Sequence, residues 1–230
     1  MSRNLILLHG ALGAAVQFSA WIPLLEDEFV VHTLDLEGHG SQPFADRAFR
    51  IGHFTENLQA YIEANGLLGA DIFGYSMGGY VALDLARKQP GKLGRIHTFA
   101  TKLAWSPETA AKEVKMLNPD VILAKVPKFA AQLETRHSGN DWRENLQRTA
   151  DLMLDLGEAP VLKPEDLAAI EIPVRMGIGD RDNMVSIRET EAFYRHLPQG
   201  EMVVLPRTPH PLEKMDPVTM TRAIREYFRE

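Results

Sequence analysis

The sequence predicts an α/β protein: a mostly parallel sheet of about six strands flanked by helices, with an inserted helical cap. Strand and helix signals alternate through residues 1–103 and again through residues 171–230. The strand runs are continuously aliphatic, as in Leu5–Leu8, which is typical of parallel strands covered on both faces. Residues 104–170 show helix signals and no convincing strand. We therefore expect a core α/β domain in two parts, 1–103 and 171–230, separated by a cap at 104–170.

The first alternating part is expected to contribute four strands to the sheet. Each apolar run is followed by turn residues and then, in most cases, by a helical pattern. This alternation predicts parallel strands joined by right-handed crossovers. The expected strands are residues 5–8, 29–34, 71–75 and 95–100, and the expected helices are 18–25, 51–62 and 80–87.

The cap is predicted from repeated helix-start signals. Ser106-Pro107 and Asn118-Pro119 each place a capping side chain before a proline at the first helical position. A longer helical run, 140–156, is closed by Gly157. These helices are too many for a single crossover connection, so a separate small layer is expected.

The second alternating part is expected to complete the sheet. A strand over 174–178 precedes a turn, and Ser186 with Glu189 forms a capping box that opens a helix to His196. The last strand is expected at 201–205, followed by a loop over 206–211 and a final helix after Asp216-Pro217.

Composition excludes several functions. The chain has 230 residues, 25 basic and 31 acidic, with a net charge of −6, which argues against a nucleic-acid partner. There is no cysteine and no metal-binding histidine cluster, so we expect neither a metal nor a cofactor. The N-terminal apolar run is too short for a signal peptide, and no stretch reaches membrane-spanning length. We expect a cytoplasmic protein without a membrane partner that acts on a small-molecule substrate, as a monomer or homodimer.

One motif indicates nucleophilic chemistry. Gly74-Tyr75-Ser76-Met77-Gly78 lies between an apolar run and a helical pattern. A strand that reverses within one residue into a helix holds its turn residue in a strained conformation and requires small neighbours, as in a nucleophile elbow. Such a turn exposes the serine hydroxyl at a helix N-terminus, where free N–H groups favour negative charge.

Together with four other landmarks in the same order, this motif resembles the α/β-hydrolase family. The landmarks are a strand ending in His9-Gly10, an Asp35-x-x-Gly38-x-Gly40-Ser41 loop, a Gly179-x-x-Asp182 loop, and His210 before the last helix. The family usually begins with an extra strand pair for which this chain has no residues. About six strands are therefore expected, with strand 29–34 at an open edge.

The resemblance implies a catalytic triad of Ser76, Asp182 and His210, in the chain order that this fold requires. Ser76 would supply the hydroxyl, and His210, flanked by prolines, would be the base. Asp182 matches the family pattern better than Asp180, which remains a competitor in the same turn. We expect Asp35, His39 and Ser41 to stabilise their own loop rather than to act in catalysis.

The oxyanion hole is expected to use two backbone N–H groups. The resemblance assigns one to Met77, after the nucleophile, and the other to Ala11, with Leu12 as an alternative. If the family's strand order holds, the strands ending at His9 and Tyr75 are neighbours, so that their loops face one crevice.

The serine at position 76 excludes the family branches that use an aspartate nucleophile, namely haloalkane dehalogenases and epoxide hydrolases. The resemblance then implies a carboxylesterase-type hydrolase that forms an acyl-enzyme on a small to medium, largely apolar acyl group. Carbon–carbon bond hydrolysis, haloperoxidase or perhydrolase activity and a slow receptor-like hydrolase remain alternatives. Arginines in the cap leave a carboxylate-bearing substrate open. The pocket is expected to involve Leu12, Trp105, Phe129, Trp142 and Met153.

Overall fold

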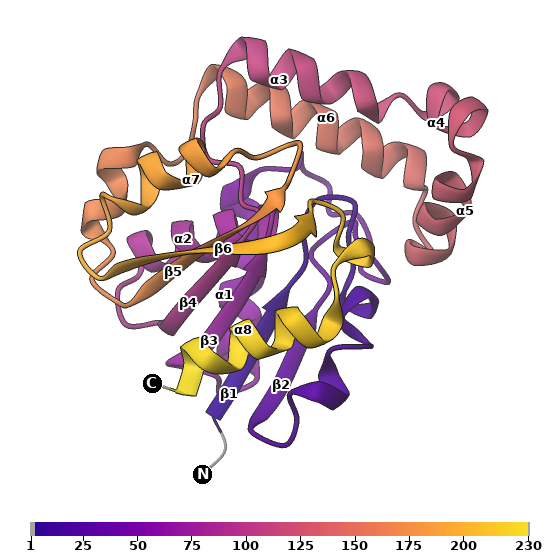
Figure 1. Ribbon diagram of the computed structural model, residues 1–230. Coiled ribbons are helices and arrows are strands. Elements are labelled where there is room, and N and C mark those ends of the chain that lie inside the picture. Colours follow the sequence, from indigo (N-terminus) through magenta and orange to yellow (C-terminus); the bar gives the residue numbers. More distant parts are fainter. Residues whose placement is uncertain (1–2, 230) are drawn as a thin grey trace.

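The computed structural model describes residues 3–229, so residues 1, 2 and 230 at the ends of the predicted domain ranges lie outside the described part. Within it, six strands form one sheet in the order β2-β1-β3-β4-β5-β6, and all five pairings are parallel (Figure 1). The strands are β1 (Arg3–Leu8), β2 (Phe29–Leu34), β3 (Ala70–Tyr75), β4 (Leu93–Phe99), β5 (Val174–Arg181) and β6 (Gly200–Pro209). The predicted fold class and strand number are confirmed, and β2 lies at an edge as expected.

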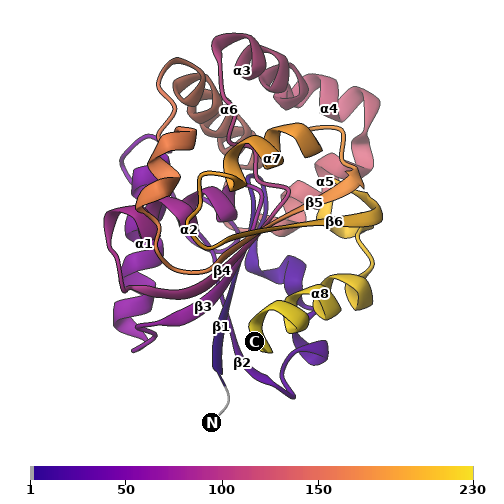
Figure 2. The same cartoon turned by 60° about the vertical axis from the view of Figure 1, so that its left-hand side comes forward.

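Helices cover both faces of the sheet and its upper end (Figures 1 and 2). One buried cluster packs α1 and α2 against one face, and a second cluster packs α8 against the other. The helices are α1 (Ile51–Ala64), α2 (Met77–Lys88), α3 (Pro107–Val114), α4 (Pro119–Lys125), α5 (Pro127–Arg136), α6 (Trp142–Glu158), α7 (Ile187–Tyr194) and α8 (Pro217–Arg229). Among residues 3–229, no helix has the length and apolarity needed to cross a membrane.

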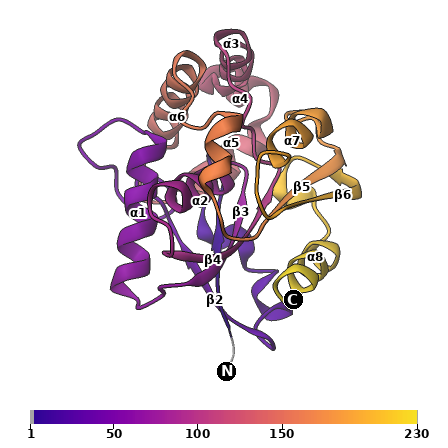
Figure 3. The same cartoon turned by 90° about the vertical axis from the view of Figure 1, so that its left-hand side faces the viewer.

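The segment 104–170 contains α3, α4, α5 and α6, and none of its residues lies in a strand. These helices lie beyond the carboxyl ends of the strands, and Figure 3 shows α3, α4 and α6 above the sheet from a second direction. Helices α3 and α6 approach each other closely at Gly157. A Cβ placed on this glycine would lie only 2.6 Å from the Cβ of Ala110. The predicted cap segment therefore forms a helical layer over the strand ends.

One predicted helix is not formed, and two predicted strands end later than expected. The expected helix over 18–25 is replaced by two short 3₁₀ segments, Ala15–Phe18 and Ile22–Leu24. Pro23 lacks the N–H that a continuous α-helix would need there. The last strand does not end at Leu205 but continues to Pro209, so the loop begins at His210. Likewise, β5 extends beyond Ile178 to Arg181, directly before Asp182.

Candidate active site

The turn between β3 and α2 contains Ser76 in a strained backbone conformation, with φ 51° and ψ −119°. The strain is enforced by close packing on both sides of the turn. A Cβ on Gly74 would lie 2.6 Å from the backbone nitrogen of Gly79, and one on Gly78 would lie 2.4 Å from the Leu8 carbonyl oxygen. Helix α2 begins at Met77, immediately after Ser76. The geometry is that of the predicted elbow, and its helix begins three residues earlier than expected.

His210 and Asp182 meet at the ends of the neighbouring strands β5 and β6. The distance from His210 Nδ1 to Asp182 Oδ2 is 2.7 Å, and both side chains are buried. The other oxygen, Asp182 Oδ1, accepts hydrogen bonds from the N–H groups of Met184 and Val185, each at 2.8 Å. These bonds orient the carboxylate toward the imidazole. The ring bond leaves Nδ1 as the donor and Nε2 free to accept a proton.

Asp180, the competing acid, has a different partner. Its Oδ1 accepts a hydrogen bond from the backbone N–H of Thr208 at 3.2 Å, which ties β5 to β6. It is also exposed, whereas the Asp182 side chain is buried at the histidine. The structure therefore brings Asp182, and not Asp180, against His210.

Tyr75, the residue before the serine, was not identified from the sequence. Its buried hydroxyl donates a 2.8 Å hydrogen bond to the backbone carbonyl of His210. Burial raises the pKa of the Tyr75 phenol, so the hydroxyl remains a donor. The bond connects the elbow directly to the histidine loop. Only its position next to the nucleophile could have suggested such a role.

The loop after β1 lies against the elbow. Leu8 pairs with Gly74 across β1 and β3, and a Cβ on Gly10 would lie 2.9 Å from the Ser76 Cβ. Ala11 and Met77 both line the cavity that also contains Ser76 and His210. Within residues 3–229, neither of their N–H groups donates a hydrogen bond. Both N–H groups are therefore without an acceptor among the described residues.

Leu12, the alternative donor, has a left-handed conformation with φ 57°. Its carbonyl accepts hydrogen bonds from Arg136 Nη1 at 2.8 Å and from His137 Nε2 at 3.1 Å. His137 Nδ1 in turn accepts the Gly40 N–H at 3.0 Å. The end of α5 thus clamps the loop that contains Ala11, which sequence patterns did not predict.

The Asp35 loop is held by its own side chains, as expected. Asp35 accepts hydrogen bonds from the N–H of Ala15 at 2.7 Å and from the N–H of Ser41 at 3.0 Å. The His39 ring lies tilted against His9 and edge-on to His137, with centroid distances of 5.1 and 5.8 Å. Burial lowers the pKa of all three histidines, to about 4 for His137, so they are neutral near pH 7.

A cavity of about 50 Å³ lies between Ser76 and the cap. Two of the five predicted pocket residues, Trp105 and Met153, line it. The other lining residues of the core are Ala11, Ile51, Met77, Tyr80, Lys102, Met184, Val185 and His210, and those of the cap are Glu113, Thr149, Leu152 and Leu156. The wall is mostly apolar, but Lys102, Glu113 and Thr149 are polar.

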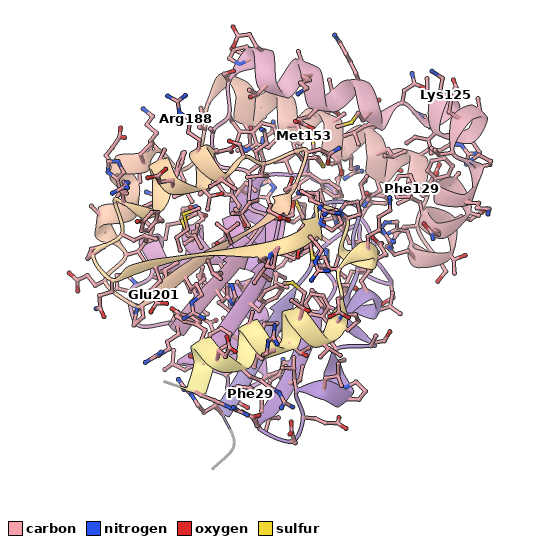
Figure 4. All side chains as sticks on the ribbon, viewed as in Figure 1. Phe29, Lys125, Phe129, Met153, Arg188 and Glu201 are labelled. Carbon is pink, nitrogen blue, oxygen red and sulfur yellow. The ribbon has the colours of Figure 1, made fainter. Side chains whose placement is uncertain are left out.

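The other three predicted pocket residues do not line this cavity. Trp142 belongs to a separate apolar cluster within the cap, and Leu12 and Phe129 pack against that cluster. Figure 4 shows Met153, a residue of α6, well apart from Phe129, a residue of α5 at the other end of the cap. The prediction fails for these residues because apolar bulk in small helices mainly serves to pack the helices together.

Nothing in the described part of the chain indicates a metal centre. Among residues 3–229, no group of three or more histidine and acidic side chains could hold an ion.

The three arginines of the cap already have partners within the protein. Arg136 pairs with Glu213, and Arg148 donates hydrogen bonds to the Ala45 and Arg47 carbonyls. Arg143 lies 4.5 Å from the Trp142 ring centroid. The cap arginines are therefore poor candidates for substrate recognition.

A family model for the α/β hydrolase fold matches residues 3–159. A pimeloyl-[acyl-carrier protein] methyl ester esterase from Neisseria meningitidis is 27% identical, covering 90% of this chain and 86% of that relative. The solved structure of a thermophilic esterase from Thermogutta terrifontis is 26% identical with a TM-score of 0.78, over 100% of this chain and 90% of that one. An enol-lactonase from Burkholderia xenovorans has a TM-score of 0.81 at 16% identity, over 100% and 92%, which shows a shared fold.

Proposed function

The chain belongs to the α/β hydrolase fold family, and from this premise we propose that it cleaves carboxylic esters through a Ser76–His210–Asp182 triad and an acyl-enzyme. The predicted resemblance and the predicted class, a hydrolase with esterase relatives, are confirmed by the family match and by those relatives. The observation on which the triad rests is the 2.7 Å contact between His210 and Asp182 at the cavity that Ser76 lines.

The proposed mechanism follows from the hydrogen bonds of the site. His210 takes the Ser76 proton on Nε2, since Nδ1 is bonded to Asp182. The serine oxygen attacks the ester carbonyl, and the N–H groups of Ala11 and Met77 stabilise the oxyanion, each by about 3 kcal/mol. The alcohol leaves with the proton from His210, and water then releases the acid by the same route in reverse.

We infer a small to medium, largely apolar acyl group from the cavity. Leu152, Met153, Leu156 and Trp105 supply most of its cap wall, and its volume is about 50 Å³. Methionine side chains adapt to different ligand shapes. In this proposal, residues 104–170 are the cap that excludes water, on a core formed by 1–103 and 171–230.

Hydrolysis of p-nitrophenyl esters of rising acyl length, by wild type and Ser76→Ala, tests the proposal. We expect turnover that disappears in Ser76→Ala while the melting temperature is maintained. The pair Asp182→Asn and Asp180→Asn tests the acid: the first should lower kcat by about 10⁴-fold, whereas the second should retain most activity. A folded wild type that cleaves none of the esters would favour carbon–carbon hydrolysis or a receptor-like role instead.

A second candidate function is hydrolysis of a methyl ester on an acyl group attached to acyl carrier protein. This is the activity named for relatives that match 90% of this chain, at 27–29% identity. The apolar cavity wall suits an alkyl chain, although a long one would require the cap to move. The two functions are separated by comparing cleavage of the same methyl ester in two forms, with the acyl group free in solution and with it attached to the carrier protein. A carrier preference above about tenfold would support this second function.

A further inference from the structure

Three polar residues from three parts of the chain line the cavity at Ser76, and together they are called its polar side. Glu113 lies on α3, Thr149 lies on α6, and Lys102 follows β4. Glu113 and Thr149 are only 3% and 1% exposed. Polar side chains buried this deeply are almost always hydrogen-bonded, because an unpaired one has lost its contact with water and gained nothing in return.

Two atoms of this polar side have no partner among residues 3–229. They are Glu113 Oε2 and Thr149 Oγ1, both fully enclosed. The first is a strong acceptor, and the second can donate or accept. Because both residues line the cavity that contains Ser76, the missing partner can be a group of the substrate.

Lys102 has acceptors nearby, but its ammonium group is not saturated with hydrogen bonds. Its Nζ lies 3.4 Å from the Met184 carbonyl and 3.9 Å from both Glu113 Oε1 and Glu189 Oε2. Both carboxylate distances exceed the hydrogen-bond range, so the ammonium has donor capacity left. Glu189 Oε1 is occupied, since it accepts the N–H groups of Leu103 and Ala104 at 3.0 and 2.9 Å.

The charges of this group decide what it can bind. At their formal charges, Lys102, Glu113 and the adjacent Glu189 sum to one negative charge. A substrate carboxylate would find one cation but two nearby anions. An uncharged amide or hydroxyl can accept from Lys102 and donate to Glu113 at the same time, and it adds no charge to a buried site.

We propose that the polar side of the cavity, Lys102, Glu113 and Thr149, binds an uncharged hydrogen-bonding group, an amide or hydroxyl, on the acyl part of the substrate. This inference rests on the proposed ester hydrolysis at Ser76. It modifies that proposal, since the acyl group is then apolar along its length but polar at one point.

Three methyl esters of nearly equal size test the proposal: methyl succinamate, monomethyl succinate and methyl 4-methylpentanoate. They end in an amide, a carboxylate and an apolar isopropyl group. Hydrolysis is followed by proton release at constant pH. We expect wild type to prefer the amide ester over the apolar ester by about tenfold or more in kcat/KM, and the carboxylate ester to be the poorest.

Two near-isosteric variants attribute the preference to the named atoms. Glu113→Gln should raise kcat/KM for the carboxylate ester by about tenfold, because it removes the repelling charge. Thr149→Val should reduce the amide preference, measured as the ratio of kcat/KM for the amide ester to that for the apolar ester. Thr135→Val, the same change at an exposed position of α5, serves as the matched control and should alter none of the ratios.

The outcomes separate the two proposals. The inference is overturned if the enzyme depends on Ser76 but prefers the apolar or the carboxylate ester. It is also overturned if the amide preference persists in both variants. In that case the polar atoms are only structural or bind water. Loss of the proposed function is different: no ester is cleaved, or cleavage persists in Ser76→Ala. If a variant fails to fold, the wild-type preference among the three esters still tests the inference, because a preference for the apolar or the carboxylate ester overturns it.

Discussion

Replacing Tyr75 with phenylalanine removes only the hydroxyl, which donates a 2.8 Å hydrogen bond to the His210 carbonyl. The ring itself stays packed in the buried cluster that β3 shares with α8. The change leaves a carbonyl of the buried histidine without this partner. We therefore expect the free energy of unfolding to fall by about 2 kcal/mol, within the usual range for an orphaned buried acceptor. For a chain of this length, the melting temperature should fall by about 4–8 °C.

The effect on catalysis should be distinct from the effect on stability. Tyr75 does not line the cavity, so substrate binding loses no contact. The histidine loop does lose a positional restraint, and small displacements of a catalytic group slow reactions strongly. We expect kcat to fall by about tenfold while KM is unchanged, measured with one p-nitrophenyl ester well below the melting temperature.

Tyr61→Phe is the matched control, because its hydroxyl makes no hydrogen bond among residues 3–229. It should change the free energy of unfolding by less than about 0.5 kcal/mol and leave kcat unaltered. If Tyr75→Phe lowers the melting temperature but leaves kcat within twofold of wild type, Tyr75 is a structural residue and the positioning argument is wrong.

Three further predictions concern the histidines, the elbow and the clamp. Burial lowers the pKa of His97 from 6.5 to about 3, so the stability linked to its neutral form is complete above pH 6.5 and is lost as pH falls toward 3. Denaturant titrations from pH 7 to 5 should show about 1.4 kcal/mol lost per pH unit from this residue once the pH is below 6.5, and His97→Leu should flatten that slope. Gly78→Ala should unfold or inactivate the protein, since its Cβ would lie 2.4 Å from a carbonyl oxygen of β1, whereas Gly52→Ala in α1 meets no atom closer than 3.8 Å and should be tolerated. Arg136→Met removes the bond to the loop after β1 and should lower kcat by about tenfold, with Arg143→Met as the control; equal activity of the two variants would contradict a role for the clamp.

Local patterns were sufficient for the fold and for the nucleophile. Continuous aliphatic runs predicted the parallel strands, because strands covered on both faces need apolar residues at every position. The turn at Ser76 was predictable because its glycines are a steric requirement and because a strand pattern precedes them and a helical pattern follows. The length of the last strand was not predictable, since Pro206 and Pro209 signal a loop although β6 continues through them.

Contacts between distant elements had to come from the tertiary structure. Arg136 reaches Leu12 across 124 residues of sequence, and Tyr75 reaches His210 across 135. The family pattern already favoured Asp182 over Asp180, and the tertiary structure shows that Asp182 is the carboxylate against His210, whereas Asp180 binds the Thr208 N–H.

The sequence by itself determined the sheet, the elbow and the order of the catalytic candidates, because secondary structure and steric turns depend on neighbours in the chain. Only the tertiary structure decided which cap residues face the serine. It placed Trp105 and Met153 along the cavity, left Trp142 inside the cap, and added the polar pair Glu113 and Thr149. The physical reason is that an amphipathic helix has one apolar face, and the packing of the whole chain decides what that face covers.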